Sequence, residues 1–135
     1  MHLATLTLAA LLSTSAHALP QQIVSGAEVT GTTCLDPTIP FDTHDTNVAI
    51  LSICGSIAGT IQKCGGNPAS TTGVSGTSKF TLEATDAGST INISKGRWER
   101  CIKAAQLTCA TGSFESVCLG GATPAGDVRF ALTEA

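Results

Sequence analysis

Six cysteines constrain the fold of this chain more than any other feature of its sequence. They are Cys34, Cys54, Cys64, Cys101, Cys109 and Cys118. An even number of cysteines in a short secreted chain indicates full pairing, so we expect three disulfides and no free thiol. A zinc site needs close pairs such as C-x-x-C, and even the two nearest cysteines are farther apart than that. We therefore expect no metal site and no cofactor.

The first 18 residues have the pattern of a secretory signal peptide. Leu3 to Leu12 form a short apolar run, and Ala16-His17-Ala18 then supplies a small-x-small cleavage site. The run is shorter than the stretch of about 20 apolar residues that crosses a bilayer. We expect cleavage after Ala18 and a secreted, extracellular protein in which residues 19–135 form a single disulfide-stapled domain.

The charge of the chain disfavours several classes of partner. Only 13% of the residues are charged, the formal net charge is −3, and the sequence has no basic run. Binding to nucleic acid or to anionic lipid depends on clustered Lys and Arg. We therefore expect no nucleic-acid partner. The rest of the chain has no apolar stretch long enough to span a bilayer, so we expect no integral membrane segment, and we expect a monomeric protein.

Two amphipathic helices are predicted. Asp42, Thr43 and Asp45 offer capping oxygens for the first, which Gly65-Gly66 ends. Its apolar face comprises Ile50, Ile53, Cys54, Ile57, Ile61 and Cys64. The second begins between Ser94 and Arg97 and stops at Gly112. Its shared face comprises Trp98, Cys101, Ile102, Ala105 and Cys109. This places Trp98 in the core, in preference to a role as an exposed anchor for a partner.

Alternating residues predict strands around the helices. Residues 79–84 and 90–94 should form a hairpin that buries Phe80, Leu82, Ile91 and Ile93. Residues 127–133 should form a last strand that buries Val128, Phe130 and Leu132. A weaker first strand is predicted near residues 23–29, a loop at 69–76, and a short helical turn from Phe114 to Leu119.

The resulting order is β-α-β-β-α-β. It predicts the α+β fold class with a ferredoxin-like split βαβ arrangement, in which two helices cover one face of a four-stranded antiparallel sheet. The predicted core combines the apolar faces of all these elements: Ile50, Ile53, Ile57, Ile61, Phe80, Leu82, Ile91, Ile93, Trp98, Ile102, Val128, Phe130 and Leu132.

The chain resembles the small secreted cysteine-rich fungal effectors that have the killer-toxin-like α/β-sandwich fold. The resemblance rests on the signal peptide, the even cysteine set and the element order, with Cys54, Cys64, Cys101 and Cys109 inside the helices. It covers residues 27–134. It implies a virulence-type protein of the host apoplast or another extracellular space, without catalytic machinery. Killer toxins are released by cleavage at paired basic residues, and this chain has no Lys-Arg or Arg-Arg pair.

The sequence offers little catalytic chemistry. His44 is the one histidine beyond the signal peptide, so a mechanism with two histidines is impossible. A ribonuclease-like set of His44, Glu99 and Arg97 or Arg100 stays formally open, although an exposed position beside the helix cap is the simpler interpretation of His44. Carboxylate pairs could also be drawn, and their members are more simply surface or cap residues: Glu99 with Glu115, or Asp42 with Asp45. We expect no catalytic residue.

Asn92-Ile93-Ser94 is a sequon for N-glycosylation. Asn92 is opposite in phase to Ile91 and Ile93, so its side chain should face solvent. Occupied and unoccupied sequons are equally compatible with the sequence.

The predicted topology also favours one of the 15 possible disulfide patterns. Two antiparallel helices would bring Cys64 to Cys101 and Cys54 to Cys109, because the cysteine spacings along the two helices nearly match. Cys34 would then pair with Cys118 at the opposite end.

These features predict a non-enzymatic, secreted, fungal effector-like protein that acts extracellularly by binding an unknown host or competitor target. Two alternatives stay open: an antimicrobial or killer-toxin-like protein, and a small secreted nuclease or hydrolase. The net charge of −3 weighs against a membrane-active toxin, because such proteins are usually basic.

Overall fold

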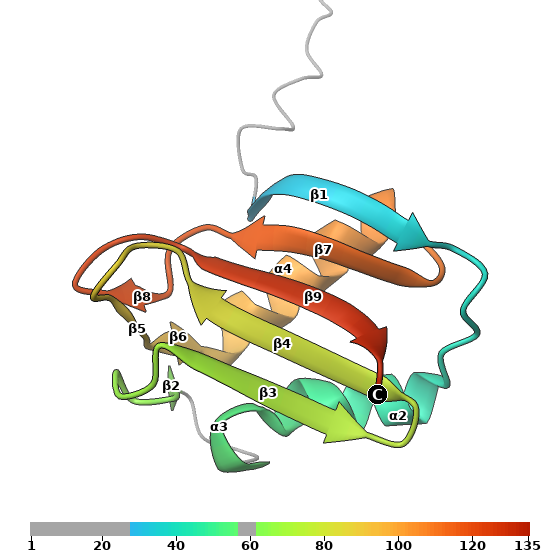
Figure 1. Cartoon of the computed structure of the whole chain (residues 1–135), viewed down its shortest axis with the longest axis horizontal. Helices are drawn as coiled ribbons and strands as arrows, with labels where there is room; N and C mark the ends of the chain where they lie inside the picture. Colours follow the sequence, from blue (N-terminus) through green and yellow to red (C-terminus); the bar gives the residue numbers. More distant parts are fainter. Residues whose placement is uncertain (1–27, 57–61) are drawn as a thin grey trace, which may run out of the picture.

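One antiparallel sheet of five strands forms the body of the protein (Figure 1). The structure is a computed structural model, and it describes residues 28–56 and 62–135. The strand order across the sheet is β1-β7-β9-β4-β3. The strands are β1 (Val29–Asp36), β3 (Ser70–Ser75), β4 (Ser78–Ala84), β7 (Ser113–Cys118) and β9 (Val128–Glu134).

Two helices pack on the same face of this sheet. They are α2 (Thr43–Leu51), which contacts β3 and β4, and α4 (Lys95–Thr108), which contacts β1 and β7. Two small ladders stand beside the main sheet. One pairs β2 (Gln62–Lys63) with β6 (Ile93–Ser94), and the other pairs β5 (Thr90–Ile91) with β8 (Ala122–Thr123). The fold is thus a mixture of helices and antiparallel sheet, as predicted.

The strand arrangement differs from the predicted four-stranded, ferredoxin-like sheet. The predicted hairpin partner of residues 79–84 was residues 90–94, but β4 pairs with β3 and β9 instead. Residues 69–76, predicted as a loop, contain β3, whose edge position leaves its side chains largely polar. Residues 114–118 of the predicted turn belong to β7, where buried Ser116 stands at a position that usually carries an apolar residue. Small polar residues therefore removed the polar–apolar alternation by which strands β3 and β7 could have been predicted.

The first helix ends much earlier than its apolar periodicity predicted. Helix α2 stops at Leu51, and the segment α3 (Ile53–Ser56) contains left-handed backbone at Cys54, with φ of 55°, and at Gly55, with φ of 90°. Cys54 bonds to Cys64, with a Cα separation of 5.0 Å. A continuous helix would hold these two cysteines about 15 Å apart.

The second helix is confirmed. Ser94 caps α4, since its hydroxyl oxygen accepts a hydrogen bond from the Arg97 N–H at 3.1 Å. Trp98, Cys101, Ile102 and Ala105 are buried, as the spacing predicted. The position of Trp98 in the core, rather than on the surface, is also confirmed.

Most of the predicted core is confirmed. The fully or almost fully buried members are Ile53, Phe80, Leu82, Ile91, Ile93, Trp98, Ile102, Val128, Phe130 and Leu132. Ile50 is half-buried against this cluster. Ile57 and Ile61 lie outside the described residues, as do the signal peptide and the weak strand signal at Ile23-Val24. Phe114, on the unforeseen strand β7, is a further core residue.

All six cysteines are paired, as predicted, but the predicted nested pattern is wrong. The disulfides are Cys34–Cys109, Cys54–Cys64 and Cys101–Cys118. The register of β1 against β7 explains two of them. Cys34 lies opposite Phe114, whereas Cys118 lies opposite Val29 at the far end of the same ladder. Cys34 therefore reaches Cys109 at the end of α4, and Cys118 reaches Cys101 in its middle, so both bridges join α4 to the sheet rather than to α2.

A glycine sets how closely α2 approaches the sheet. Gly73 is buried on β3, and a Cβ there would overlap the Ala49 carbonyl oxygen and crowd Ile53. We expect Gly73→Ala to lower the free energy of unfolding by about 1–3 kcal/mol in urea denaturation, because overpacking displaces the helix. Gly96→Ala is the control. It lies in α4 near only the end of the Arg100 side chain, and it should leave stability unchanged or raise it by about 0.5–1 kcal/mol. Equal stability of Gly73→Ala and wild type would contradict this packing.

Candidate binding site between helices α2 and α4

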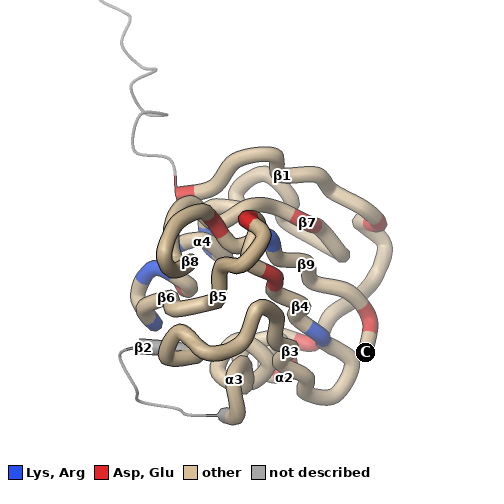
Figure 2. Tube along the Cα trace, turned by 60° about the vertical axis from the view of Figure 1, so that its left-hand side comes forward, with Lys and Arg blue, Asp and Glu red and all other residues tan. Residues whose placement is uncertain are grey.

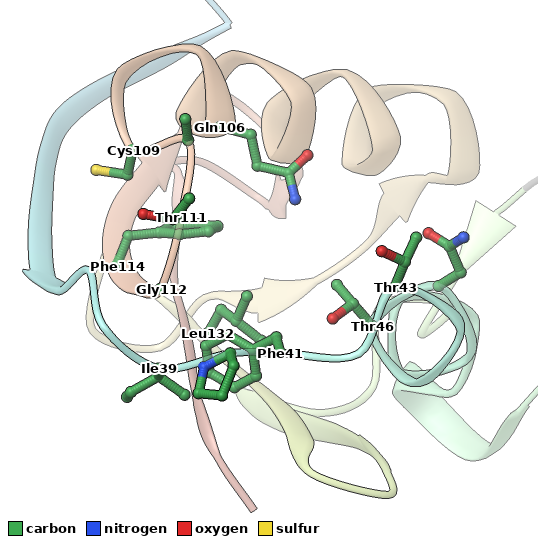
Figure 3. A pocket seen from close by; sticks show the side chains of 13 residues that line it. Ile39, Phe41, Thr43, Thr46, Gln106, Cys109, Thr111, Gly112, Phe114 and Leu132 are labelled. Carbon is green, nitrogen blue, oxygen red and sulfur yellow. The ribbon is translucent and has the colours of Figure 1, made fainter.

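A cavity of about 330 Å³ opens between the start of α2 and the end of α4 (Figure 3). Its base is formed by β7 and β9, and the connection from β1 to α2 closes one side. The lining comprises Ile39, Pro40, Phe41, Thr43, Thr46, Asn47, Gln106, Cys109, Ala110, Thr111, Gly112, Phe114 and Leu132.

The cavity has an apolar floor and a polar rim. Phe114 and Leu132 are almost fully buried at the floor, and Phe41 is half-buried beside them. Exposed side chains with hydroxyl or amide groups form the rim: Thr43, Asn47, Gln106 and Thr111. Among the described residues that line this cavity, none carries an ionisable side chain. Ligand sites commonly combine such an apolar surface with a few hydrogen-bonding groups.

Hydrogen bonds position the α2 wall of the cavity. Asp42 caps α2, because its carboxylate accepts from the Asp45 N–H at 2.9 Å. The Thr46 hydroxyl lies 3.0 Å from the Asp42 carbonyl oxygen and 2.9 Å from the Ser78 hydroxyl oxygen on β4. The Asp45 carboxylate in turn accepts from the Thr77 N–H at 3.1 Å. The first turn of α2 is thereby tied to the β3–β4 turn.

The opposite wall is held by a disulfide and a close backbone contact. The Cys34–Cys109 bridge joins the end of α4 to β1. Gly112 follows with φ of 80°, and a Cβ there would overlap the Asp36 carbonyl oxygen and the Pro37 Cα. Only glycine allows both this conformation and this approach. The chain that leaves α4 is therefore packed directly against the connection from β1 to α2.

A second cavity of about 250 Å³ continues the first along the two helices. The two cavities share Asn47 and Gln106, and together we call them the interhelical groove. The second cavity is also lined by Ile50, Leu51, Glu99, Ile102 and Lys103. Glu99 forms an ion pair with Lys95 at 2.7 Å. The groove thus has a neutral half at the end of α4 and a half with charged side chains farther along the helices.

The ribonuclease-like set is not assembled in the groove. His44 is exposed on the first turn of α2, as its simpler interpretation predicted, and it lines neither cavity. Arg97 donates to the Leu119 carbonyl oxygen at 2.7 Å, and Arg100 pairs with Glu28 at 3.4 Å. Each arginine therefore has a structural contact, and Glu99 is the one member of the set that lines the groove.

The other candidate carboxylates have separate positions. Asp42 and Asp45 are the cap and first-turn residues of α2, as their simpler interpretation predicted. Glu115 is exposed on β7, at a ladder position opposite Thr33 and Ala131. Glu99 is engaged with Lys95 on α4.

Asn92 is less exposed than its phase predicted. It lies between β5 and β6, it is half-buried, and its N–H donates to the Gly121 carbonyl oxygen at 2.8 Å. The neighbours Ile91 and Ile93 are buried, as expected. The use of Asn92 as a glycosylation site stays a prediction.

Acidic positions are spread over the described chain, whereas basic positions gather near α4 (Figure 2). Helix α4 carries Lys95, Arg97, Arg100 and Lys103, with Glu99 among them. The Thr38 hydroxyl and N–H both donate to the Asp36 carboxylate, and these hydrogen bonds lower the pKa of Asp36. Within residues 28–56 and 62–135, no cluster of three or more His, Cys, Asp or Glu side chains could hold a metal ion. No helix in the same ranges is long and apolar enough to span a membrane.

The groove could not be foreseen from local sequence. In the sequence, Asn47 and Gln106 are ordinary polar residues of two separate helices, and they belong to no common motif. The one available signal is their spacing from the apolar residues Ile50 and Ile102, which places them at the border of each buried face.

Comparison with known proteins does not add to this picture. The chain matches no known family profile, and no similar curated protein or solved structure is found.

Proposed function

We propose that this protein is a secreted, non-enzymatic, fungal effector-like protein with a killer-toxin-like α/β-sandwich fold. It acts as a monomer outside the producing cell by binding a target on a host or competitor. The three disulfides support this proposal, because such bonds persist in oxidising compartments. The proposed binding surface is the interhelical groove.

The observation that carries the proposal is the composition of the larger cavity. Its lining provides hydrogen-bonding amides and hydroxyls over an apolar floor, which suits recognition of a ligand. General acid–base catalysis requires a titratable group within reach of the substrate. No such group is present among the described residues that line the larger cavity. Glu99 and Lys103 line the second cavity, and the candidate base His44 lies outside the groove.

The experiment compares binding with turnover. Fluorescently labelled protein 19–135 is incubated with intact cells and cell walls of candidate hosts and competing microbes. We expect saturable binding that excess unlabelled protein displaces. The same preparation should not hydrolyse RNA, polysaccharide or peptide substrates. Absence of saturable binding on every surface would contradict the proposal. So would a turnover that His44→Ala abolishes, because that result would favour the nuclease or hydrolase alternative.

A further inference from the structure

We infer that the larger cavity of the interhelical groove binds an uncharged sugar unit of a cell-surface glycan. This inference rests on the proposed binding function and specifies its ligand class. It follows from three properties of the cavity: its electrical neutrality, the arrangement of its polar groups around an apolar floor, and the absence of a free strand edge among the strands that line it.

Neutrality excludes strongly charged ligands. A carboxylate, phosphate or ammonium that enters the cavity would lose hydration, and such a loss is costly without a paired opposite charge. The described lining offers hydroxyls, amides and apolar groups as partners. The charged residues of the groove, Glu99 and Lys103, line the second cavity, where Glu99 is already paired with Lys95.

The polar groups face each other across the floor. Thr43 on the α2 wall lies opposite Gln106 and Thr111, which belong to the end of α4 and the chain that follows (Figure 3). Asn47 also lines the cavity from α2. Amide side chains both donate and accept, as do hydroxyls, so this rim can satisfy a ring of sugar hydroxyls.

The floor suits the other surface of a sugar. Phe41 is half-buried and lies between the two walls, beside Phe114 and Leu132, which are almost fully buried, so Phe41 supplies the accessible apolar surface of the floor. A pyranose ring presents C–H groups on its faces and hydroxyls around its edge. Its faces therefore match the floor while its edge matches the rim.

An extended peptide fits this cavity less well. Peptides commonly bind by adding a strand to an open sheet edge. The cavity is lined by strands β7 and β9, and both are hydrogen-bonded on both sides. Strand β7 lies between β1 and β9, and strand β9 lies between β7 and β4. They offer no edge to a peptide, so recognition must come from side chains.

The cavity walls are also held in place before a ligand arrives. The Cys34–Cys109 bridge fixes one wall, and the contact between Thr46 and Ser78 fixes the other. A preformed site loses little conformational entropy on binding, and this favours weak ligands such as single sugar units.

The test is calorimetric titration of protein 19–135 with neutral tetrasaccharides of glucose, mannose and N-acetylglucosamine. An oligomer of galacturonic acid, which is negatively charged, is the comparison ligand. We expect one-to-one binding of at least one neutral tetrasaccharide and no heat of binding with the acidic oligomer. Asn47→Ala and Gln106→Ala remove exposed side chains and should each weaken binding by about fivefold to tenfold, the loss expected for one hydrogen-bonding partner. Thr81→Ala, on the exposed face of β4, should leave the affinity unchanged.

Three results would overturn this inference. The first is that no neutral tetrasaccharide binds. The second is that the acidic oligomer binds more strongly than the neutral tetrasaccharides. The third is that wild type, Asn47→Ala and Gln106→Ala have equal affinities. Saturable binding to cells that persists in excess of every tetrasaccharide would reject the sugar as ligand and leave the proposed binding function standing. Absence of cell binding alongside tetrasaccharide binding would reject the proposed function instead.

Discussion

Replacing Trp98 with alanine should lower the free energy of unfolding by about 3–5 kcal/mol, as large-to-small changes of buried aromatic residues do. Trp98 lies at the centre of the core. Its ring meets Phe80 and Phe130 edge to face, with centroid distances of 5.3 and 5.2 Å. Its Nε1 donates to the Ile50 carbonyl oxygen near the end of α2 at 2.9 Å. The substitution therefore removes packing and leaves a carbonyl group without its partner.

Chemical denaturation monitored by circular dichroism measures this effect. Leu107→Ala is the matched control, because it truncates a large apolar residue of the same helix that is 88% exposed. We expect that control to stay within about 0.5 kcal/mol of wild type. If Trp98→Ala were no more destabilising than Leu107→Ala, the core described above would be wrong.

Removing the Cys34–Cys109 disulfide should produce the second large loss. The bridge closes a loop with a sequence separation of 75 residues, so the chain-entropy relation gives about 4.5 kcal/mol for a Cys34→Ala/Cys109→Ala double variant. Removing Cys54–Cys64, with a separation of 10 residues, should cost less, about 3 kcal/mol by the same relation. Unfolding in urea under non-reducing conditions provides both values.

Removing the Cys34–Cys109 disulfide should also weaken ligand binding. Cys109 lines the cavity and fixes the end of α4, whereas Cys54–Cys64 lies outside the larger cavity. We expect the Cys34–Cys109 variant to lose affinity and the Cys54–Cys64 variant to retain it at temperatures where both remain folded. If the Cys54–Cys64 variant were the less stable of the two, or the one that lost affinity, the Cys34–Cys109 disulfide would not have this role.

Elements with a strong local pattern could be predicted from the sequence. In α4 the Ser94 cap, the apolar spacing from Trp98 to Ala105 and the stop before Gly112 all agree. In β9 the alternation of Val128, Phe130 and Leu132 is equally clear. Local preference and tertiary packing favour the same structure in both elements, so their prediction did not depend on the rest of the fold.

Elements decided by tertiary contacts could not be predicted. Ile50, Ile53 and Cys54 have helical spacing, but α2 ends at Leu51, and left-handed backbone at Cys54 and Gly55 accompanies the disulfide from Cys54 to Cys64. The disulfide pairing depends on the register of β1 against β7, and β7 itself was hidden by buried serines. Missing β7 therefore led to the wrong partners for Cys34 and Cys118, while the early end of α2 explains the Cys54–Cys64 bridge.

The candidate site could not be predicted from the sequence either, because it also depends on tertiary contacts. Asn47 and Gln106 line the same groove only because α2 and α4 pack on one face of the sheet. The residues that sequence analysis considered for chemistry were titratable ones such as His44 and Glu115. The cavity instead consists of neutral side chains, whose role depends on geometry rather than on residue type.

The most direct test of the proposed function is a comparison of cell binding among variants at three separate surfaces. The set comprises Asn47→Ala/Gln106→Ala in the groove, Thr81→Ala on the open face of the sheet and His44→Ala on the first turn of α2. We expect the groove variant to bind at least about tenfold more weakly than wild type, which corresponds to about 1.4 kcal/mol, while the other two bind like wild type. Wild-type binding by the groove variant, combined with a loss in either of the others, would contradict the assignment of the interhelical groove as the functional site.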